Sequence, residues 1–241
     1  MSFNKSKCMV MHLGKKNMKV DYVMDNHPLK KVSEEKDLGV FITDNLKSAR
    51  QCQEAYSKAS RALGMIACTI SYKTKEVLLK LYKSLVRQHP EYCVSAWSPH
   101  YVKDKMLIER IQHRFSKMVP GLNNLPYEAR IGGLGLWTLE ECWNRADLLS
   151  MFKMYKGLLP MPFNQFFKIS TNSTTRSHSA KIRKLSANWT FDVFFFSERV
   201  INRWNQLDQE AVDSGTVNSF KNNLKRIRKS KIGFFMDHPV R

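Results

Sequence analysis

Basic side chains recur at helical spacing in the middle of the chain. Between residues 103 and 118 the apolar residues repeat at intervals of three and four, which predicts a helix. The side predicted to face inward carries Met106, Leu107, Ile111, Phe115 and Met118. The opposite side carries Lys103, Arg110, Arg114 and Lys117. Cations at regular intervals on a rigid helix can contact successive phosphate groups and release counterions. This spacing favours nucleic-acid contact, with a solvated helix face as the alternative that it leaves open.

Two further groups of cations are candidates for the same chemistry. A predicted amphipathic helix that begins near Val77 carries Lys80, Lys83 and Arg87 outside its apolar stripe. The last predicted helix, over residues 217–229, has an outward cluster of Lys225, Arg226, Arg228 and Lys229. That cluster could bind RNA or act as a nuclear-import signal, and a basic terminus without either role is the alternative.

The overall charge agrees with a polyanionic partner. The 241 residues have a formal net charge of +19, from 40 Lys and Arg against 21 Asp and Glu. The excess lies in the middle and C-terminal parts: residues 46–160 hold 18 basic and 9 acidic residues, and residues 161–241 hold 14 and 6. Such a field attracts nucleic acid or an anionic membrane surface. A solvated surface without a dedicated partner is the alternative.

The cysteines and histidines do not predict a metal site or a disulfide framework. The five cysteines are scattered and include no C-x-x-C pair. Cys8 with His12 and His89 with Cys93 have loose ligand spacing, but strand residues four apart chelate poorly, so zinc is disfavoured. No apolar run is long enough for a membrane span or a signal-peptide core. We therefore expect an intracellular protein, in the nucleus, the cytoplasm or both, with no membrane and no small-molecule substrate.

The N-terminal elements are predicted to be short strands. Residues 8–13 and 18–24 alternate as strands, and the turn at residues 14–17 predicts a hairpin between them. A third strand over residues 38–43 follows a charged loop, 33–37. Three strands without a helix bury little surface, so this part of the chain is predicted to be the end of a sheet that begins elsewhere.

Helices are predicted for most of the remaining chain. One spans 47–70, and the next begins after Thr74 as N-cap and is stopped or kinked by Pro90, with a short helix to follow. Thr138 is predicted to cap a helix that runs to about residue 156. Residues 157–184 are rich in Pro, Ser and Thr and are predicted to be a surface linker. The fold class is mainly α.

Blocks of sequence in the same order resemble the reverse transcriptases of LINE-type (non-LTR) retrotransposons, of the jockey and chicken-repeat clade. The central block comprises Leu-Tyr-Lys-Ser-Leu-Val-Arg at 81–87, Glu-Tyr-Cys at 91–93 and Trp-Ser-Pro at 97–99. The last is Phe-Phe-Ser-Glu-Arg-Val at 195–200 with Trp-Asn at 204–205. Further blocks lie at 3–14, 35–40, 51–73 and 107–112. Residues 142–144 depart from the Arg-rich pattern of the family.

The resemblance implies a division of the chain. Residues 1–45 would be the end of the palm sheet, 46–156 a thumb-like helical bundle, 157–184 a linker and 185–241 a basic C-terminal helical extension. Lys7 would match the motif lysine near the incoming nucleotide, and Leu38 and Gly39 the primer grip. For Lys7 a solvated lysine at a strand edge is the alternative from the residue alone.

The carboxylates that catalysis needs are missing from the chain. Tyr22 to Asp25 look like a polymerase signature, but that chemistry needs paired aspartates to hold two metal ions. Asn26 follows Asp25, and adjacent aspartates do not occur in the sequence. The Mg²⁺ ligands of the family are thus absent, and we expect no cofactor and no polymerase activity from this chain alone.

The resemblance implies binding of RNA or RNA–DNA duplex, largely independent of sequence, with the remainder of a reverse transcriptase as a second partner. The alternative is a domesticated or decaying helical domain that binds proteins and has no nucleic-acid function.

Overall fold

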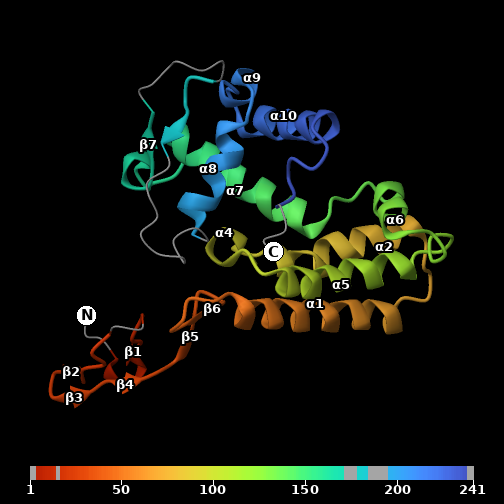
Figure 1. Ribbon diagram of the computed structural model, residues 1–241. Helices are drawn as coiled ribbons and strands as arrows, with labels where there is room; N and C mark the ends of the chain where they lie inside the picture. The colour runs from red at the N-terminus through yellow and green to blue at the C-terminus, as the bar shows by residue number, and fades with distance from the viewer. Residues whose placement is uncertain (1–3, 15–16, 171–177, 184–194, 238–241) are drawn as a thin grey trace.

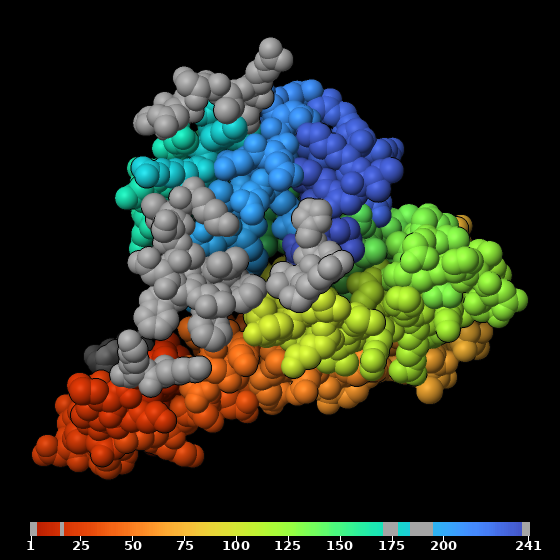
Figure 2. Space-filling view, in the orientation of Figure 1, coloured from red at the N-terminus to blue at the C-terminus, as the bar shows by residue number. Residues whose placement is uncertain are grey.

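The computed structural model describes residues 4–14, 17–170, 178–183 and 195–237 and is mainly helical. The long helix α1 (Ala49–Thr69) lies beside α5 (Val102–Met118), with the N-terminal strands beyond one end of α1 (Figure 1). In the space-filling view these strands project from the body of the helices (Figure 2). A second group of helices, in the C-terminal part, packs above the first.

The N-terminal strands pair differently from the prediction. β1 (Met9–Val10) pairs in parallel with β4 (Lys30–Lys31), and β2 (Val23–Met24) pairs antiparallel with β3 (His27–Pro28). The predicted hairpin between residues 8–13 and 18–24 is therefore wrong. The hairpin that the structure forms turns at Asp25 and Asn26, whose φ angles of 48° and 61° suit a two-residue turn.

The charged segment before residue 38 is a strand and not a loop. β5 (Glu34–Asp37) pairs antiparallel with β6 (Val40–Thr43). All four residues of β5 are exposed, so its charges stay solvated and do not oppose strand formation. Leu38 and Gly39, with φ of 44° and 86°, form the turn between them. The Phe41 N–H donates to Gln51 Oε1 at 2.9 Å, which joins this hairpin to α1.

The helical run that follows Thr74 ends at Glu91, one residue after Pro90, where the sequence predicts a stop or a kink. Thr74 Oγ1 accepts a hydrogen bond from the Val77 N–H, so the predicted N-cap of α2 (Lys75–Leu81) is confirmed. A π-helical segment, Tyr82–Val86, joins α2 to α3 (Gln88–Glu91). There the Arg87 N–H donates to the carbonyl of Tyr82, five residues back, at 2.9 Å.

The π-helical segment lies directly before the proline. A proline has no N–H and its ring collides with the carbonyl four residues earlier, so widening the helix just before Pro90 relieves that conflict. The chain then turns at Cys93, where φ is 51°, into α4 (Val94–Trp97). The short helix expected after the break is present, but the turn that separates it comes at Cys93.

Helices α6 (Tyr127–Gly133) and α7 (Leu139–Tyr155) follow α5. The predicted cap at Thr138 is confirmed: Thr138 Oγ1 accepts from the Glu141 N–H at 3.2 Å, and Glu141 Oε2 accepts from the Thr138 N–H at 3.0 Å. The two bonds together satisfy donors that the helix itself leaves unpaired.

The C-terminal part contains α8 (Phe196–Asn205), α9 (Gln209–Val212), α10 (Val217–Ser230) and a pair of short strands, β7 (Lys168–Ile169) and β8 (Ile182–Arg183). Residues 157–184 do not lie wholly on the surface, as a linker would. Phe167, Ala180 and Ile182 are buried in the C-terminal core, because their apolar side chains cover α7 and α8. The domain boundaries themselves stay a prediction.

The helices share three clusters of buried side chains. The first joins α7, α8, α9 and α10, and the second joins α1, α2, α5 and α6. A third lies between β6, α4 and the N-terminal ends of α1, α5 and α7. Because α7 contributes to the first and the third, it connects the two groups of helices through continuous packing.

Candidate nucleic-acid interface

The four predicted cations of α5 lie on one exposed face of that helix. Lys103, Arg110, Arg114 and Lys117 are all exposed, and the opposite side buries Ile108, Ile111 and Phe115. From Lys103 to Lys117 the face extends about 21 Å, at about 1.5 Å per residue. That length corresponds to roughly six base-pair steps of about 3.4 Å.

The cations of this face form no ion pair with a carboxylate among the described residues, although the neighbouring Asp104 carboxylate interacts electrostatically with Lys103. Arg114 Nη1 donates to Ser60 Oγ on α1 at 3.5 Å, and the Lys103 ammonium lies 5.8 Å from the centre of the Tyr101 ring. Neither Arg110 nor Lys117 has an ion-pair partner in the described ranges. The face can therefore accept anionic groups without first breaking an ion pair, which lowers the cost of binding.

One apolar residue of α5 departs from the predicted pattern. Met106 was expected on the inner side but is 60% exposed, because it faces the cleft described below and not the bundle. The buried side instead includes Ile108 and the polar Gln112. Gln112 Nε2 donates to the carbonyl of Trp137 at 3.0 Å, and Gln112 Oε1 accepts from the Tyr82 hydroxyl at 2.9 Å.

The second predicted group of cations divides in two. Lys80 and Lys83 are exposed, on the side of their helix opposite the buried Leu78 and Tyr82. Arg87 is not part of that surface, contrary to the prediction. Its Nε is ion-paired with Glu91, and its Nη2 donates to Cys142 Sγ at 2.7 Å.

Arg87 turns inward because α3 packs against α7 at this point. Burial raises the pKa of the Cys142 thiol to about 12, so the group beside the guanidinium is a neutral thiol at physiological pH. Arg87 therefore depends on Glu91 as its charged partner.

The C-terminal cluster also divides. Lys225 and Lys229 are exposed and have no ion-pair partner among the described residues. Arg226 is exposed but forms a bidentate ion pair with Glu210, at 2.8 and 2.7 Å. Arg228 was predicted to point outward, but it packs over the Trp137 ring and pairs with Glu141 on α7. The available positive charge of α10 is thus smaller than its sequence suggests.

The N-terminal candidates lie apart from α5. Lys7 is exposed in a short 3₁₀ turn, Lys5–Lys7, and not in a strand. Leu38 is 83% exposed at the β5–β6 turn, and its carbonyl accepts from the Tyr92 hydroxyl at 2.9 Å. Asp25 lies at the β2–β3 turn and pairs with Lys5 at 3.3 Å. These side chains do not form one site with the α5 face, since the hairpins extend beyond the end of α1 (Figure 1).

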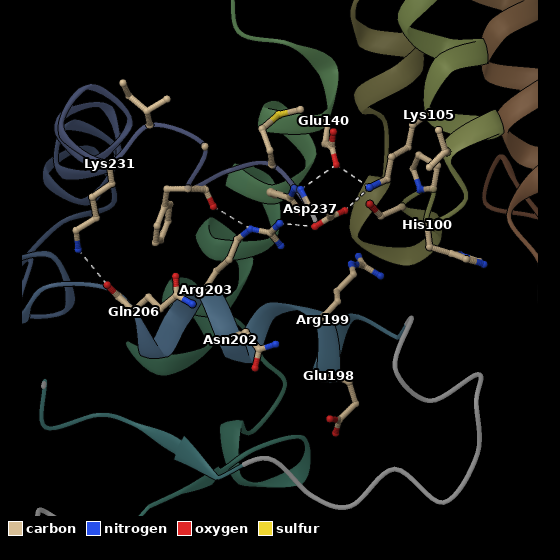
Figure 3. A pocket seen from close by; sticks show the side chains of 18 of the residues that line it. His100, Lys105, Glu140, Glu198, Arg199, Asn202, Arg203, Gln206, Lys231 and Asp237 are labelled. Carbon is tan, nitrogen blue, oxygen red and sulfur yellow. Dashed lines mark hydrogen bonds and ion pairs between the residues drawn. The ribbon is translucent and has the colours of Figure 1, made fainter. Parts of the chain in front are cut away.

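A cleft between the two groups of helices holds charged residues that the sequence analysis did not single out. The cavity measures about 790 Å³ and is lined from α5, α7, α8 and the segment after α10. Asp237 forms ion pairs with Lys105 and Arg203, and Lys105 Nζ donates to Glu140 Oε1 at 2.6 Å (Figure 3). Burial raises the pKa of the Asp237 carboxyl, but Arg203 and Lys105 outweigh burial and lower it below its usual range.

No local spacing marks this cleft in the sequence. Lys105, Glu140, Arg203 and Asp237 come from four separate elements, so only the folded chain brings them together. The one available signal is that Arg199 and Arg203 lie four residues apart on α8, one above the other. Arg199 is bound in a bidentate pair with the buried Asp147, at 2.7 and 3.0 Å.

No group of three or more His, Cys, Asp or Glu side chains in the described parts of the chain is placed to hold a metal ion. The helices of those parts are too short or too polar to cross a lipid bilayer. Comparison of the chain with protein-family models, with curated proteins and with solved structures gives no match.

Proposed function

We propose that the chain is the C-terminal part of a LINE-type reverse transcriptase and that it binds RNA or RNA–DNA duplex through the exposed basic face of α5. The single observation that carries this proposal is the alignment of Lys103, Arg110, Arg114 and Lys117 on one exposed face without an ion pair among the described residues. The ordered blocks of sequence that resemble the family support the assignment of the fragment to the palm end, thumb and extension.

The proposed binding has no catalytic component. Adjacent aspartates do not occur in the sequence, and Asp25 is a single exposed carboxylate paired with Lys5. A two-metal site needs paired carboxylates that hold two metal ions about 3.5 to 4 Å apart, which one aspartate at a turn does not supply. The chain alone would therefore hold a template and primer but not extend the primer.

The test is the salt dependence of duplex binding. A fluorescently labelled RNA–DNA duplex of about 20 base pairs is titrated with the protein at 50 and 200 mM salt. Four phosphate contacts predict a loss of affinity of about a hundredfold between these salt concentrations. Flat binding across this range, or no binding at 50 mM, would refute the proposal.

A matched pair of variants locates the interface. The first carries Gln at Lys103, Arg110, Arg114 and Lys117. The second carries Gln at four exposed lysines outside the candidate nucleic-acid surfaces, Lys19, Lys30, Lys73 and Lys168. Both lose four positive charges, so a general field effect weakens binding in both equally. The proposal requires that the first loses most of the affinity and the salt dependence and that the second keeps them.

A second candidate function, protein binding, is favoured by one observation. The N-terminal segment exposes several large apolar side chains that no described element covers, among them Met18 at 88% and Val23 at 62%. Its two-residue strands also leave unpaired backbone edges that can pair with another chain. This candidate predicts concentration-dependent association in light scattering, abolished by Met18→Ser with Val23→Ser, and no binding of duplex at low salt.

A further inference from the structure

The Asp237 carboxylate bridges two cations that come from different groups of helices. One of its oxygens pairs with Arg203 on α8 and the other with Lys105 on α5 (Figure 3). The Asp237 N–H donates to Glu140 Oε1 at 3.1 Å. Lys105 and Arg203 are each only 14% exposed, so the carboxylate neutralises two largely desolvated charges.

Phe235, two residues before Asp237, holds this segment in the C-terminal core. Phe235 is 1% exposed in the C-terminal core, and its carbonyl accepts from Asn144 Nδ2 at 2.8 Å. The Phe234 carbonyl accepts from Arg203 Nε at 3.2 Å. Asp237 itself is 40% exposed and borders the open cavity. The carboxylate can therefore leave the cations by a movement of Met236 and Asp237, without opening the core around Phe235.

We infer that Lys105 and Arg203 form a binding site for a phosphate group, for which the Asp237 carboxylate is a built-in competitor. A carboxylate that accepts through both oxygens occupies the two positions that two phosphate oxygens would take between an ammonium and a guanidinium. The cavity of about 790 Å³ beside Asp237 leaves space for a group attached to that phosphate.

The carboxylates of the cleft determine when the site is cationic. Glu140 already offsets part of the charge on Lys105, at 2.6 Å. When Asp237 is also in place, Lys105 and Arg203 are balanced by the carboxylates of Glu140 and Asp237, which repel an added anion. Once Asp237 moves out, one positive charge is in excess in a desolvated position. The site thus admits a phosphate only by exchange with Asp237.

The source of the phosphate rests on the proposed function. Met106 borders the exposed basic face of α5 and also lines the cleft, so a nucleic-acid backbone that follows this face would pass near the cleft at the start of α5. A free phosphate or phosphomonoester offers the same chemistry to Lys105 and Arg203. The experiment therefore measures inorganic phosphate and the duplex in separate arms.

In the first arm, calorimetry measures the affinity for inorganic phosphate at constant ionic strength. A competitor on a short tether acts at an effective concentration of the order of millimolar, so the wild-type protein should bind phosphate weakly. Asp237→Asn should bind it at least about tenfold more tightly, and adding Arg203→Gln should abolish the gain. Asp44→Asn, which removes an exposed carboxylate elsewhere, makes the same charge change and should bind as the wild type does.

In the second arm, the same variants are titrated with the labelled duplex. Tighter duplex binding by Asp237→Asn than by Asp44→Asn identifies the backbone phosphate as the ligand. Phosphate binding that depends on Arg203, without any duplex binding, supports the site and refutes the proposed function instead. Equal phosphate affinity of Asp237→Asn and Asp44→Asn overturns the site, whatever the duplex does.

The Asp237→Asn variant is informative only if it folds. A second variant and a measurement on the wild-type protein therefore accompany it. Asp237→Ser is a second neutral variant, and cooperative melting is required of each. In the wild-type protein, phosphate should shift the amide resonance of Asp237, because exchange breaks its hydrogen bond to Glu140. If the Asp237 amide resonance does not shift at phosphate concentrations well above the effective concentration of the Asp237 carboxylate, the inference is also overturned.

Discussion

Arg228 and Glu141 form a bidentate ion pair that fastens α10 to the first turn of α7. Arg228 Nε donates to Glu141 Oε1 and Nη2 to Oε2, each at 2.7 Å. The guanidinium carbon lies 4.7 Å from the centre of the Trp137 ring. Glu141 also accepts from the Thr138 N–H, so one carboxylate both caps α7 and holds α10.

The first prediction follows from this pair. Arg228→Gln should lower the free energy of unfolding by about 1 to 2 kcal/mol, because a partly buried carboxylate loses two charge-assisted hydrogen bonds and Trp137 loses a stacked cation. Urea denaturation measures the change. Lys229→Gln, a neutral substitution at the neighbouring exposed position, should change stability by less than about 0.5 kcal/mol. Equal midpoints for the two variants would contradict the structural role of Arg228.

The second prediction concerns single cations of the α5 face. Arg110→Gln should weaken duplex binding and reduce the slope of log affinity against log salt by about 0.7 to 0.9, the contribution of one phosphate contact. Arg228→Gln should leave that slope unchanged in the folded protein, since its guanidinium is occupied by Glu141. A slope that falls equally in both variants would show that the duplex responds to net charge and not to the α5 face.

How much of this could be predicted from the sequence differs between the helices and the strands. The helix at 49–69 and the caps at Thr74 and Thr138 follow from local apolar periodicity and from the hydrogen bonds of a cap, and the structure confirms them. The strand pairing could not be predicted in the same way. It depends on positive φ at Leu38, which carries no turn signal, and at Asp25 and Asn26, whose types favour turns but do not specify which strands pair.

In the candidate site, too, features within one helix could be predicted from the sequence, and features that depend on distant residues could not. The stripe from Lys103 to Lys117 lies within one helix, so its alignment is a consequence of helical geometry alone. The positions of Arg87 and Arg228 depend on Cys142 and Glu141, which are distant in sequence, and spacing within their own helices could not reveal those partners. The Lys105–Arg203 cleft is still further from local reasoning, because four elements must fold together to create it.

The third prediction concerns the pH dependence of stability. Burial lowers the pKa of His89, His113 and His178, and burial together with nearby cations, Lys105 first, lowers that of His100 to about 4. In the unfolded chain a histidine titrates near pH 6.5. Between about pH 6.5 and 4, His100 binds a proton in the unfolded chain but stays neutral in the folded protein. The free energy of unfolding therefore falls as the pH falls from about 6.5 toward 4.

The measurement compares variants because buried carboxylates act in the opposite sense. Burial raises the pKa of Asp147 and of Glu109, so those groups favour the folded state as the pH falls. The drop in melting temperature between pH 7.5 and 5.0 should therefore be smaller in His100→Gln than in the wild-type protein. His27→Gln, at an exposed position of β3, is the matched control. Identical drops in His100→Gln and the wild type would contradict the prediction.

The fourth prediction tests the buried hydrogen bonds beneath the α5 face. Tyr82 is fully buried in the π-helical segment, stacks on Phe115 with ring centres 3.9 Å apart, and donates to Gln112 Oε1 at 2.9 Å. Tyr82→Phe keeps the stacking but leaves the Gln112 oxygen without that donor, so stability should fall by about 1 to 3 kcal/mol. Tyr72→Phe removes a hydroxyl from a side chain that is 74% exposed and should change stability by less than about 0.5 kcal/mol. Chemical denaturation compares the two. Because the hydroxyl lies inside the bundle, duplex binding by folded Tyr82→Phe should match the wild type, and weaker binding would show that this buried contact also orients the basic face.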